Sequence, residues 1–326
     1  MKKKYIGIDL GSSNIIIYNN QKGIIYNEPN VVAIDNKTGK VINGGYLALK
    51  MLGKENNSVS VYRPVSNGVI NSISLMTLLL KFIAKEKRNK NLFKKSYLVI
   101  STPSELTEVN ILSLKKIAKN LEARSIILKS QSILALYGSN QSQVNSRGNL
   151  IVTIGGGCSD ISVTSGSDSL ISKTSAFSGK KIDEAICRHI RKKHKLIIGE
   201  KTSEYIKMKI GSLEQFPENR LLEVSGKDII TSLPSSVIIS TIEIKQAIVP
   251  VISELVEAIT DCLELTPSEI ASDIIESGII ICGGTSILNG IREYLESNLN
   301  TTVRVLSDPS YSVINGIKNF IHQIAK

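Results

Sequence analysis

Tryptophan is absent from this chain of 326 residues, and histidine (three) and cysteine (four) are scarce. The cysteines stand at positions 158, 187, 262 and 282, form no Cys-x-x-Cys pair and are not accompanied by a zinc-type histidine spacing. Disulfide frameworks and zinc sites need such spacings, so the sequence argues against both. The glycine-rich signatures GxxxxGK[ST] and GxGxxG are also missing, so the sequence does not support the P-loop and dinucleotide-binding folds.

Long hydrophobic runs are missing as well. No apolar stretch approaches the ~20 residues that span a bilayer. The basic start, MKKKYIGID, resembles the charged part of a signal peptide, but Asp9 interrupts the apolar stretch that follows. We therefore expect a strand at this position and a cytoplasmic protein.

Positive charge is in excess, with 40 Lys and Arg against 29 Asp and Glu, a net charge of +11. This excess favours an anionic partner, such as nucleotide phosphate, anionic lipid or nucleic acid. The lysines are scattered, few aromatic residues lie between them, and no DNA-reading module is recognisable. We expect no nucleic-acid partner.

A strand-turn-strand pattern occurs twice, at residues 5–18 (YIGIDLGSSNIIIY) and 150–164 (LIVTIGGGCSDISVT). Each copy has a β-branched apolar run, a polar turn with glycine and a second β-rich run, which predicts a hairpin. Two copies half a chain apart predict two domains of similar architecture. The polar segment 139–149 between them is the expected connection.

Helical periodicity covers residues 75–87, 107–119, 181–195 and 241–263. The last of these has Ser240 as N-cap and Glu243 in position for a capping box, while Pro250 is expected to kink or divide it. Residues 278–288 (GIIICGGTSIL) predict a strand, a glycine pair and a helix that begins near Ser286. Strands mixed with helices at this spacing predict an α/β fold.

Three glycine-containing turns follow β-rich strands, at residues 11–14, 155–158 and 283–285. Backbone N–H groups in such a turn can point at one anion, and glycine lets the anion approach without a Cβ clash. One such turn is more often only a hairpin. Three of them, two in duplicated units, predict a phosphate clamp with two jaws and a third turn at the nucleoside.

These turns resemble the two phosphate motifs and the adenosine motif of the actin, sugar-kinase and heat-shock-chaperone superfamily. Within it the chain is most similar to the MreB family over almost its whole length, for example at residues 27–34 (NEPNVVAI), 63–70 (RPVSNGVI), 226–234 (GKDIITSLP) and 265–274 (LTPSEIASDI). The resemblance implies an actin-like fold of two α/β domains around a nucleotide cleft. The expected domains are 1–146 with 313–326, and 147–312, with small subdomains at 31–66 and 182–248.

The resemblance also implies a site for ATP or ADP with Mg²⁺. Asp9 is expected to face the metal and the phosphates. Glu204 and Lys207, one helix turn apart, match positions that reach the adenosine, although sequence alone favours a solvated pair. The remaining expected contacts are Gly11, Ser12, Ser13 and Asn14 in the first clamp, Gly155, Gly156 and Gly157 in the second, and Gly283, Gly284, Thr285, Ser286 and Ile287 at the base and ribose.

Two expected catalytic positions depart from the family. Thr153 stands where the family has an aspartate in its second phosphate motif, and a hydroxyl cannot supply a carboxylate to the Mg²⁺ shell. Gln131 aligns with the glutamate that positions the attacking water in MreB, with Ser130 as the next candidate. A glutamine can orient water but cannot act as a base, so we expect a weak Mg-dependent ATPase.

A basic segment at residues 85–95 (KEKRNKNLFKK) contains Leu92 and Phe93. The pair resembles the membrane-inserting loop of some MreB proteins, with lysines placed to meet anionic headgroups. The alternative is that the pair folds back onto the body of the protein. The resemblance favours a peripheral location at the inner face of the cell membrane.

The favoured function is a self-assembling, ATP-gated filament that supports cell shape or motility, with other MreB copies as further partners. A plasmid-segregating filament stays open as an alternative. So does a small-molecule kinase, although Thr153 stands where it would need an acidic base. A chaperone would need a further substrate-binding domain. Abundant Lys, Ile, Asn and Ser indicate an AT-rich genome, which fits a divergent copy from a wall-less bacterium.

Overall fold

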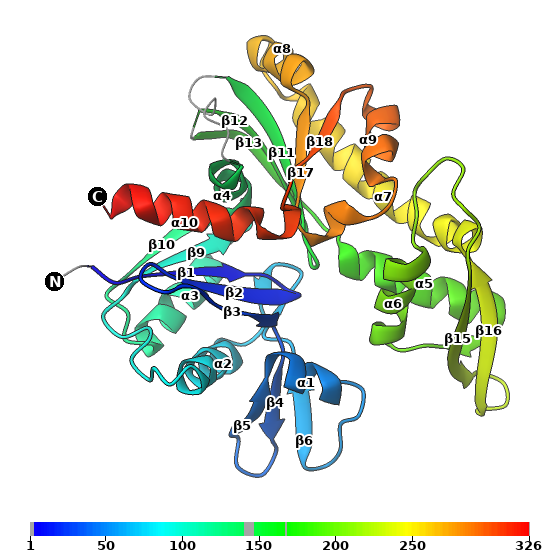
Figure 1. The fold of residues 1–326 in the computed structure, drawn as a ribbon, viewed down its shortest axis with the longest axis horizontal. Coiled ribbons are helices and arrows are strands. Elements are labelled where there is room, and N and C mark those ends of the chain that lie inside the picture. The colour runs from blue at the N-terminus through cyan, green and yellow to red at the C-terminus, as the bar shows by residue number, and fades with distance from the viewer. Residues whose placement is uncertain (1–2, 140–146, 167, 326) are drawn as a thin grey trace. The chain divides into compact units, whose positions relative to one another are not determined.

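The structure is a computed structural model that describes residues 3–139, 147–166 and 168–325 (Figure 1). The chain divides into two compact units, Met1–Ser146 with Ser310–Lys326, and Arg147–Pro309. We call them unit 1 and unit 2. Most of the expected connection, residues 140–146, lies outside the described residues.

Unit 1 is built on a five-stranded sheet in the order β10-β9-β1-β2-β3. Strands β1 and β2 form the first predicted hairpin, and β9 and β10 run parallel to β1. The bounds are β1 (Tyr5–Leu10), β2 (Asn14–Asn19), β3 (Gly23–Pro29), β9 (Tyr97–Thr102) and β10 (Ser125–Ser130). A smaller sheet has the order β5-β4-β6, from β4 (Val32–Asp35), β5 (Val41–Gly44) and β6 (Val59–Tyr62), next to α1 (Gly45–Met51). A short hairpin, β7 (Val65–Ser66) and β8 (Val69–Ile70), follows it.

Helices cover both faces of the unit 1 sheet. Apolar residues of α2 (Ile73–Glu86) and α3 (Glu108–Asn120) share one hydrophobic core with Ile6 and Ile8 of β1. On the other face, α4 (Gln131–Gly138) packs against α10 (Ser312–Ile324). A Cβ atom at Gly316 would lie 1.7 Å from the carbonyl oxygen of Leu134, so glycine is required where these two helices cross.

Unit 2 repeats this plan. Its five-stranded sheet has the order β13-β12-β11-β17-β18, with an antiparallel meander on one side and parallel strands on the other. The strands are β11 (Gly148–Ile154), β12 (Ser159–Ser165), β13 (Asp168–Ser175), β17 (Ile279–Cys282) and β18 (Val303–Val305). The second predicted hairpin is β11 and β12, so the duplication read from the sequence is confirmed.

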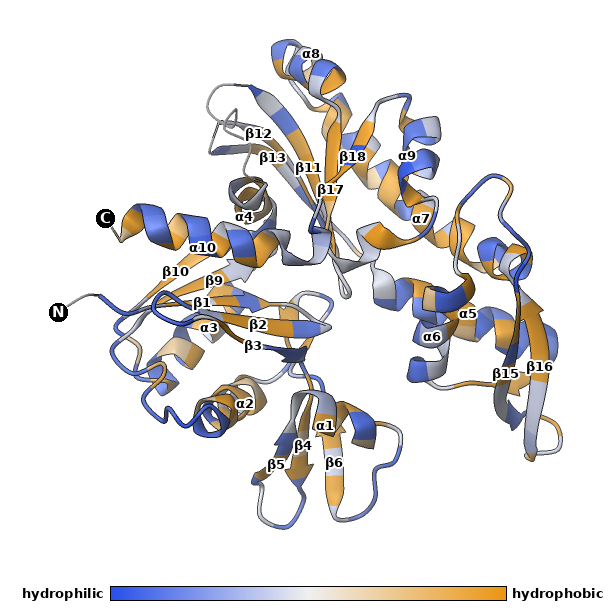
Figure 2. Cartoon of the chain, viewed as in Figure 1, coloured by the Kyte–Doolittle hydropathy of each residue, from blue (hydrophilic) through white to orange (hydrophobic). Residues whose placement is uncertain are grey.

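A second, three-stranded sheet in unit 2 has the order β14-β15-β16. Its strands are β14 (Leu196–Ile197), β15 (Leu221–Asp228) and β16 (Pro234–Ser240). The helices are α5 (Gly179–His194), α6 (Glu200–Ile210), α7 (Thr241–Glu264), α8 (Ser268–Ser277) and α9 (Ile291–Leu299), with 3-10 helices η1 (Gly284–Ile287) and η2 (Pro309–Tyr311). In Figure 2 the central strands of both units are largely hydrophobic, whereas the helices carry hydrophobic and hydrophilic residues in alternation.

The four predicted helices are confirmed within about two residues of their ends, as α2, α3, α5 and α7. The helix expected to begin near Ser286 is wrong, because residues 284–287 form the 3-10 helix η1 and α9 starts only at Ile291. Gly290, with φ at +73°, ends the intervening turn and starts that helix. Pro250 lies inside α7 without dividing it.

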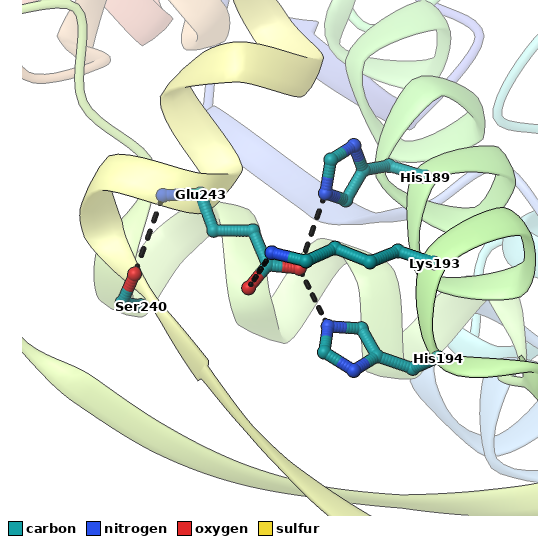
Figure 3. A network of polar contacts seen from close by, with 5 residues as sticks. All are labelled: His189, Lys193, His194, Ser240 and Glu243. Carbon is teal, nitrogen blue, oxygen red and sulfur yellow. Dashed lines mark hydrogen bonds and ion pairs between the residues drawn. The ribbon is translucent and has the colours of Figure 1, made fainter.

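Glu243 links helices α5 and α7 (Figure 3). Its backbone N–H donates to Ser240 Oγ at 3.3 Å, so Ser240 is the N-cap that the sequence predicted. The carboxylate, however, points to α5 and lies 3.1 Å from His189 Nε2, 2.6 Å from His194 Nε2 and 3.0 Å from Lys193 Nζ. Burial alone would raise the pKa of Glu243, but the hydrogen bonds from His194 and Lys193 outweigh it and hold the pKa below its usual value.

Replacing Glu243 by glutamine should lower the free energy of unfolding by about 1–3 kcal/mol at pH 7, because the substitution removes charged hydrogen bonds from a buried position. A depressed native pKa stabilises the fold only above the unfolded pKa, and this contribution is lost as the pH falls through the native pKa. The difference between Glu243→Gln and wild type should therefore shrink at pH 4 and below. Denaturant unfolding at pH 7 and pH 4 measures both values.

Glu254→Gln is the matched control, because Glu254 lies on the same helix with its side chain 48% exposed and makes only a 3.8 Å pair with Lys181. It should have little effect at either pH. Equal destabilisation by Glu243→Gln at both pH values would show that the carboxylate charge does not hold α5 to α7.

Candidate functional site

In unit 1, the predicted residue Asp9 lies near the carboxyl end of β1, where the parallel strands β1, β9 and β10 finish at one edge of the sheet. Ser101 Oγ donates to Asp9 Oδ1 at 2.7 Å and accepts from the Leu10 N–H at 3.2 Å. Gln131 follows β10 directly and so starts at the same edge. The carboxyl ends of parallel strands are the usual location of ligand sites in α/β sheets.

The charge state of Asp9 bears on metal binding. Burial raises the pKa of Asp9 above its usual value, and the hydrogen bond from Ser101 only partly offsets this. A cation brought to this carboxylate would favour its charged form. Within the described residues, no group of three or more His, Cys, Asp or Glu side chains could hold a metal by itself. One carboxylate fits Mg²⁺, which uses one or two carboxylates together with waters and phosphate oxygens.

The first turn, residues 11–13, connects β1 to β2. A Cβ atom at Gly11 would lie 2.7 Å from the Asn14 carbonyl oxygen, so this position needs glycine. Ser12 Oγ accepts from the Gly68 N–H at 3.0 Å, which fixes the turn to the β7–β8 hairpin. Beside Ser101 and Gly68 opens a hollow with an empty volume of about 300 Å³, which includes open solvent.

The second turn, residues 155–157, occupies the same place between β11 and β12 of unit 2. Here too a Cβ atom at Gly155 would lie 2.8 Å from the carbonyl oxygen three residues ahead, at Cys158. The Gly155 carbonyl accepts from the Gly179 N–H at 3.1 Å and from Thr285 Oγ1 at 3.0 Å. Gly179 is the first residue of α5, so the positive end of a 16-residue helix lies at the turn.

The third predicted motif therefore contacts the second. Thr285 reaches the Gly155 carbonyl, and Ser286 is buried, with its Oγ donating to the Gly283 carbonyl at 2.8 Å. Ile287, at the end of η1, is 68% exposed. A large exposed apolar side chain beside a phosphate-type turn is suited to contact a flat heterocycle.

Lys207 and Glu204 have different surroundings on α6. Lys207 Nζ donates to the Gly179 carbonyl at 3.1 Å and to the Asp183 carboxylate at 2.9 Å, whereas Glu204 is exposed. Burial raises the pKa of Asp183 to about 6, although Lys207 lowers it. Lys207 thus fixes the first turn of α5. It does not form the solvated pair with Glu204 that sequence alone favoured.

The two positions that depart from the family pattern lie within separate units. Thr153 is buried in β11, with its Oγ1 3.4 Å from Cys282 Sγ on the neighbouring strand. Ser130 is the N-cap of α4, because its Oγ accepts from the Ile133 N–H at 3.3 Å. With Ser130 engaged in this way, the partly exposed Gln131 is the better candidate to orient a water molecule.

The expectation that Leu92 and Phe93 are exposed for membrane insertion is wrong. They are only 1% and 3% exposed and belong to the hydrophobic core that α2 and α3 form with β1. Burying a leucine or phenylalanine side chain gains roughly 1.5–3 kcal/mol, and the loop can realise this gain by folding back. The basic residues of the same segment stay at the surface.

The comparisons with known proteins identify the family. The family model described as "MreB/Mbl protein" matches residues 3–326. The chain belongs to the MreB/Mbl family. It is 35% identical to the cell shape-determining protein Mbl of Bacillus cereus, over 95% of this chain and 93% of the relative. It is 30% identical to the cell shape-determining protein MreB of Escherichia coli, over 95% and 91%.

Solved structures share the fold. A crystal structure of MreB 5 of Spiroplasma citri bound to AMPPNP superimposes with a TM-score of 0.95 at 32% identity, covering 99% of this chain and 97% of that one. The MamK double helical filament has a TM-score of 0.82 at 18% identity, covering 98% of this chain and 99% of that one. The actin-like α/β fold expected from the resemblance to MreB is confirmed.

Several residues at the candidate site were not selected from the sequence. Ser101 could have been found, because a polar Ser-Thr pair follows the buried strand residues 98–100 and so marks a strand end. Asn30 lay within segment 27–34, which resembled MreB, and Asp183 within the helical segment 181–195, but no local pattern distinguished them. Their partners are 24 and 19 residues away along the chain, at Lys207 and Gly11.

Asp183 should titrate near pH 6, the value to which its pKa is raised. Since the unfolded pKa is near 4, the folded protein binds this proton more tightly, and the resulting stabilisation is present below about pH 4 and is lost as the pH rises through 6. Lys207→Met removes the cation that lowers this pKa, so the midpoint should move above 6. Carboxyl ¹³C NMR of aspartate-labelled protein measures it.

Lys209→Met is the control, because Lys209 is exposed on the same helix. It should leave the midpoint near 6. An unchanged midpoint in Lys207→Met would contradict the ion pair between α5 and α6.

Proposed function

We propose that this protein is an ATP-binding, filament-forming bacterial actin homologue that supports cell shape. The observation that carries the proposal is the duplicated glycine turn, which closes the first hairpin of each unit and lies beside Asp9 in unit 1 and the N-terminus of α5 in unit 2. Two relatives are named cell shape-determining proteins, and MreB 5 of Spiroplasma citri has been solved with AMPPNP and with ADP. Its partners would be further copies of itself and other MreB proteins.

Each part of the site has a distinct role in this proposal. The N–H groups of residues 11–14 and those of residues 155–157 would hold the phosphates, with the start of α5 supporting the second turn. Residues 283–287 would contact the base and ribose, with Lys207 setting the position of α5 and Glu204 at the adenosine. Asp9, oriented by Ser101, would face Mg²⁺, which supplies charge neutralisation of the phosphates.

Hydrolysis should be slow. Gln131 can hold a water molecule by hydrogen bonds, but its amide cannot accept the proton that the attacking water loses. Thr153 offers a hydroxyl where a carboxylate would assist. Bound ATP would therefore stay unhydrolysed for longer than in a relative with a carboxylate at either position.

Sedimentation tests both assembly and turnover. We expect wild-type protein to pellet as filaments with Mg-ATP, with slow phosphate release in the same tubes, and Gln131→Glu to release phosphate on the order of tenfold faster because it restores a base. Gln21→Glu, an exposed change in the β2–β3 turn of unit 1, is the matched control and should have no effect. Electron microscopy of the pellets distinguishes filaments from aggregates.

Wild-type protein that binds ATP but stays in the supernatant at every concentration would argue against self-assembly. Transfer of phosphate to a small acceptor under those conditions would favour the kinase alternative. Pelleting that requires a DNA-bound adaptor would favour the plasmid-segregating filament.

We also propose that the filament lies at the inner face of the cell membrane, held by charge rather than by insertion. In the described residues no helix is both long and apolar enough to cross a bilayer. The segment that surrounds Leu92 and Phe93 exposes six basic residues, Lys85, Lys87, Arg88, Lys90, Lys94 and Lys95. Each basic residue near an anionic surface contributes about 1 kcal/mol.

The triple change of Lys85, Arg88 and Lys90 to glutamine should therefore weaken binding to vesicles that contain anionic lipid, as measured by co-sedimentation. Wild-type binding should also fall as salt is raised. The same change at Lys115, Lys116 and Lys119, exposed on α3 of the same unit, is the matched control. Loss of vesicle binding in the control alone would place the lipid contact elsewhere.

A further inference from the structure

We propose that Asn30 is a positioning residue for nucleotide binding, which aims two backbone N–H groups of the first turn at the phosphates. The inference rests on the proposed function. Asn30 directly follows β3, is fully buried and lies behind residues 11–13 rather than among the predicted ligand contacts.

Asn30 holds the turn at two points. Its side-chain Nδ2 donates to the Gly11 carbonyl oxygen at 2.9 Å. Its backbone N–H donates to the Ser13 carbonyl oxygen at 2.8 Å. A carbonyl can only accept, so the contact with Gly11 identifies the Asn30 atom there as the nitrogen of the amide.

Because the peptide bond is planar, these contacts also fix the direction of the neighbouring backbone N–H groups. In a trans peptide the C=O and the N–H of the next residue point in opposite directions. Fixing the carbonyls of Gly11 and Ser13 towards Asn30 therefore points the N–H groups of Ser12 and Asn14 away from it. Two N–H groups that point the same way from a tight turn form an anion-binding concavity.

In unit 2, carbonyl oxygens of the second turn are also held by hydrogen bonds, but from different donors. The carbonyl of Gly155, which corresponds to Gly11, accepts from the Gly179 N–H and from Thr285 Oγ1. The carbonyl of Gly156 accepts from the Lys180 N–H at 3.0 Å. A helix N-terminus and a hydroxyl thus hold the second turn from behind. In unit 1 the corresponding carbonyl is held by the Asn30 amide.

The other half of the Asn30 amide indicates a role beyond stability. Its Oδ1 is buried without a hydrogen-bond partner among the described residues. Burying an unpaired acceptor costs free energy, which offsets part of the stability that the Nδ2 bond to Gly11 contributes. Removing the side chain deletes a favourable donor and an unfavourable acceptor together. The change should therefore affect the turn more than the stability of the unit.

The test compares two ligands in the full-length protein. Calorimetric titration gives the affinity for AMPPNP with Mg²⁺ and for adenosine, which has no phosphate. In Asn30→Ala the affinity for AMPPNP should fall about tenfold, the order expected when hydrogen bonds to a charged group are misdirected, and the affinity for adenosine should stay within about twofold. A general loss of structure would lower both.

Asn19→Ala is the matched control. Asn19 is another buried asparagine, at the far end of β2 from the turn, and its Oδ1 accepts from the Gln21 N–H at 2.8 Å. It should leave the ratio of the two affinities unchanged. Asn30→Asp is the second variant, because it keeps the shape of the side chain and replaces the donor with an acceptor. It should lose at least as much AMPPNP affinity as Asn30→Ala, and it replaces that variant if alanine prevents folding.

Three results would overturn the inference, and they are distinguishable. If wild type and Asn19→Ala bind AMPPNP and both Asn30 variants bind it equally well, Asn30 does not position the turn and the proposed function stands. If the Asn30 variants lose AMPPNP and adenosine in the same proportion, the residue only supports the unit. If wild type fails to bind AMPPNP, the proposed function fails together with this inference.

Discussion

The first position of each hairpin turn has no room for a side chain, and this steric constraint organises both units. At Gly11 and Gly155 a Cβ atom would collide with the carbonyl three residues ahead, so the chain can reverse tightly only with glycine. The tight reversal places the first two strands of each sheet in register and brings backbone N–H groups to the carboxyl edge of the parallel strands. Asp9 in unit 1 and the start of α5 in unit 2 acquire their relation to the turn from this geometry. A substitution at either glycine would therefore disturb the sheet and the site together.

The two units share a backbone plan but not the side chains that support it. The strand orders β10-β9-β1-β2-β3 and β18-β17-β11-β12-β13 correspond strand by strand. Yet the first turn is held by a side-chain amide and the second by a helix N-terminus and a hydroxyl. Likewise, Asp9 has a serine as its hydrogen-bond partner, whereas Thr153 lies against a cysteine. A carbonyl that must be fixed can accept from any suitably placed donor, so the backbone geometry can be kept while the side chains change.

Local patterns predicted much of the fold and the turns of the site. The hairpins and the helices α2, α3, α5 and α7 follow from period-2 and period-3.6 spacing and from the Ser240 cap, all within short windows of sequence. Features that depend on residues far away in the sequence were missed, or the predictions about them were wrong. Leu92 and Phe93 look like an exposed tip among lysines, but their burial depends on α2 and α3 being close by. Glu243 fits a capping box locally, yet its carboxylate is used by histidines some 50 residues earlier in the chain, at separations of 54 and 49. Local chemistry alone left the glycine turns ambiguous, and the family resemblance selected them as the candidate site.

The packing of α10 on α4 has a consequence for how the protein is made. Unit 2 is one continuous stretch, Arg147–Pro309, whereas unit 1 is completed only by Ser310–Lys326. Synthesis runs from the amino terminus, so unit 2 has all its residues before unit 1 does. Domains fold as units during synthesis, and unit 2 can therefore fold first. Until the ribosome releases α10, the apolar face of α4 and the sheet face at Gly7, which Ile317 covers, are without their partner. The amino-terminal part of unit 1 therefore stays incomplete on the ribosome, with apolar surface uncovered, until residues 310–326 have been made.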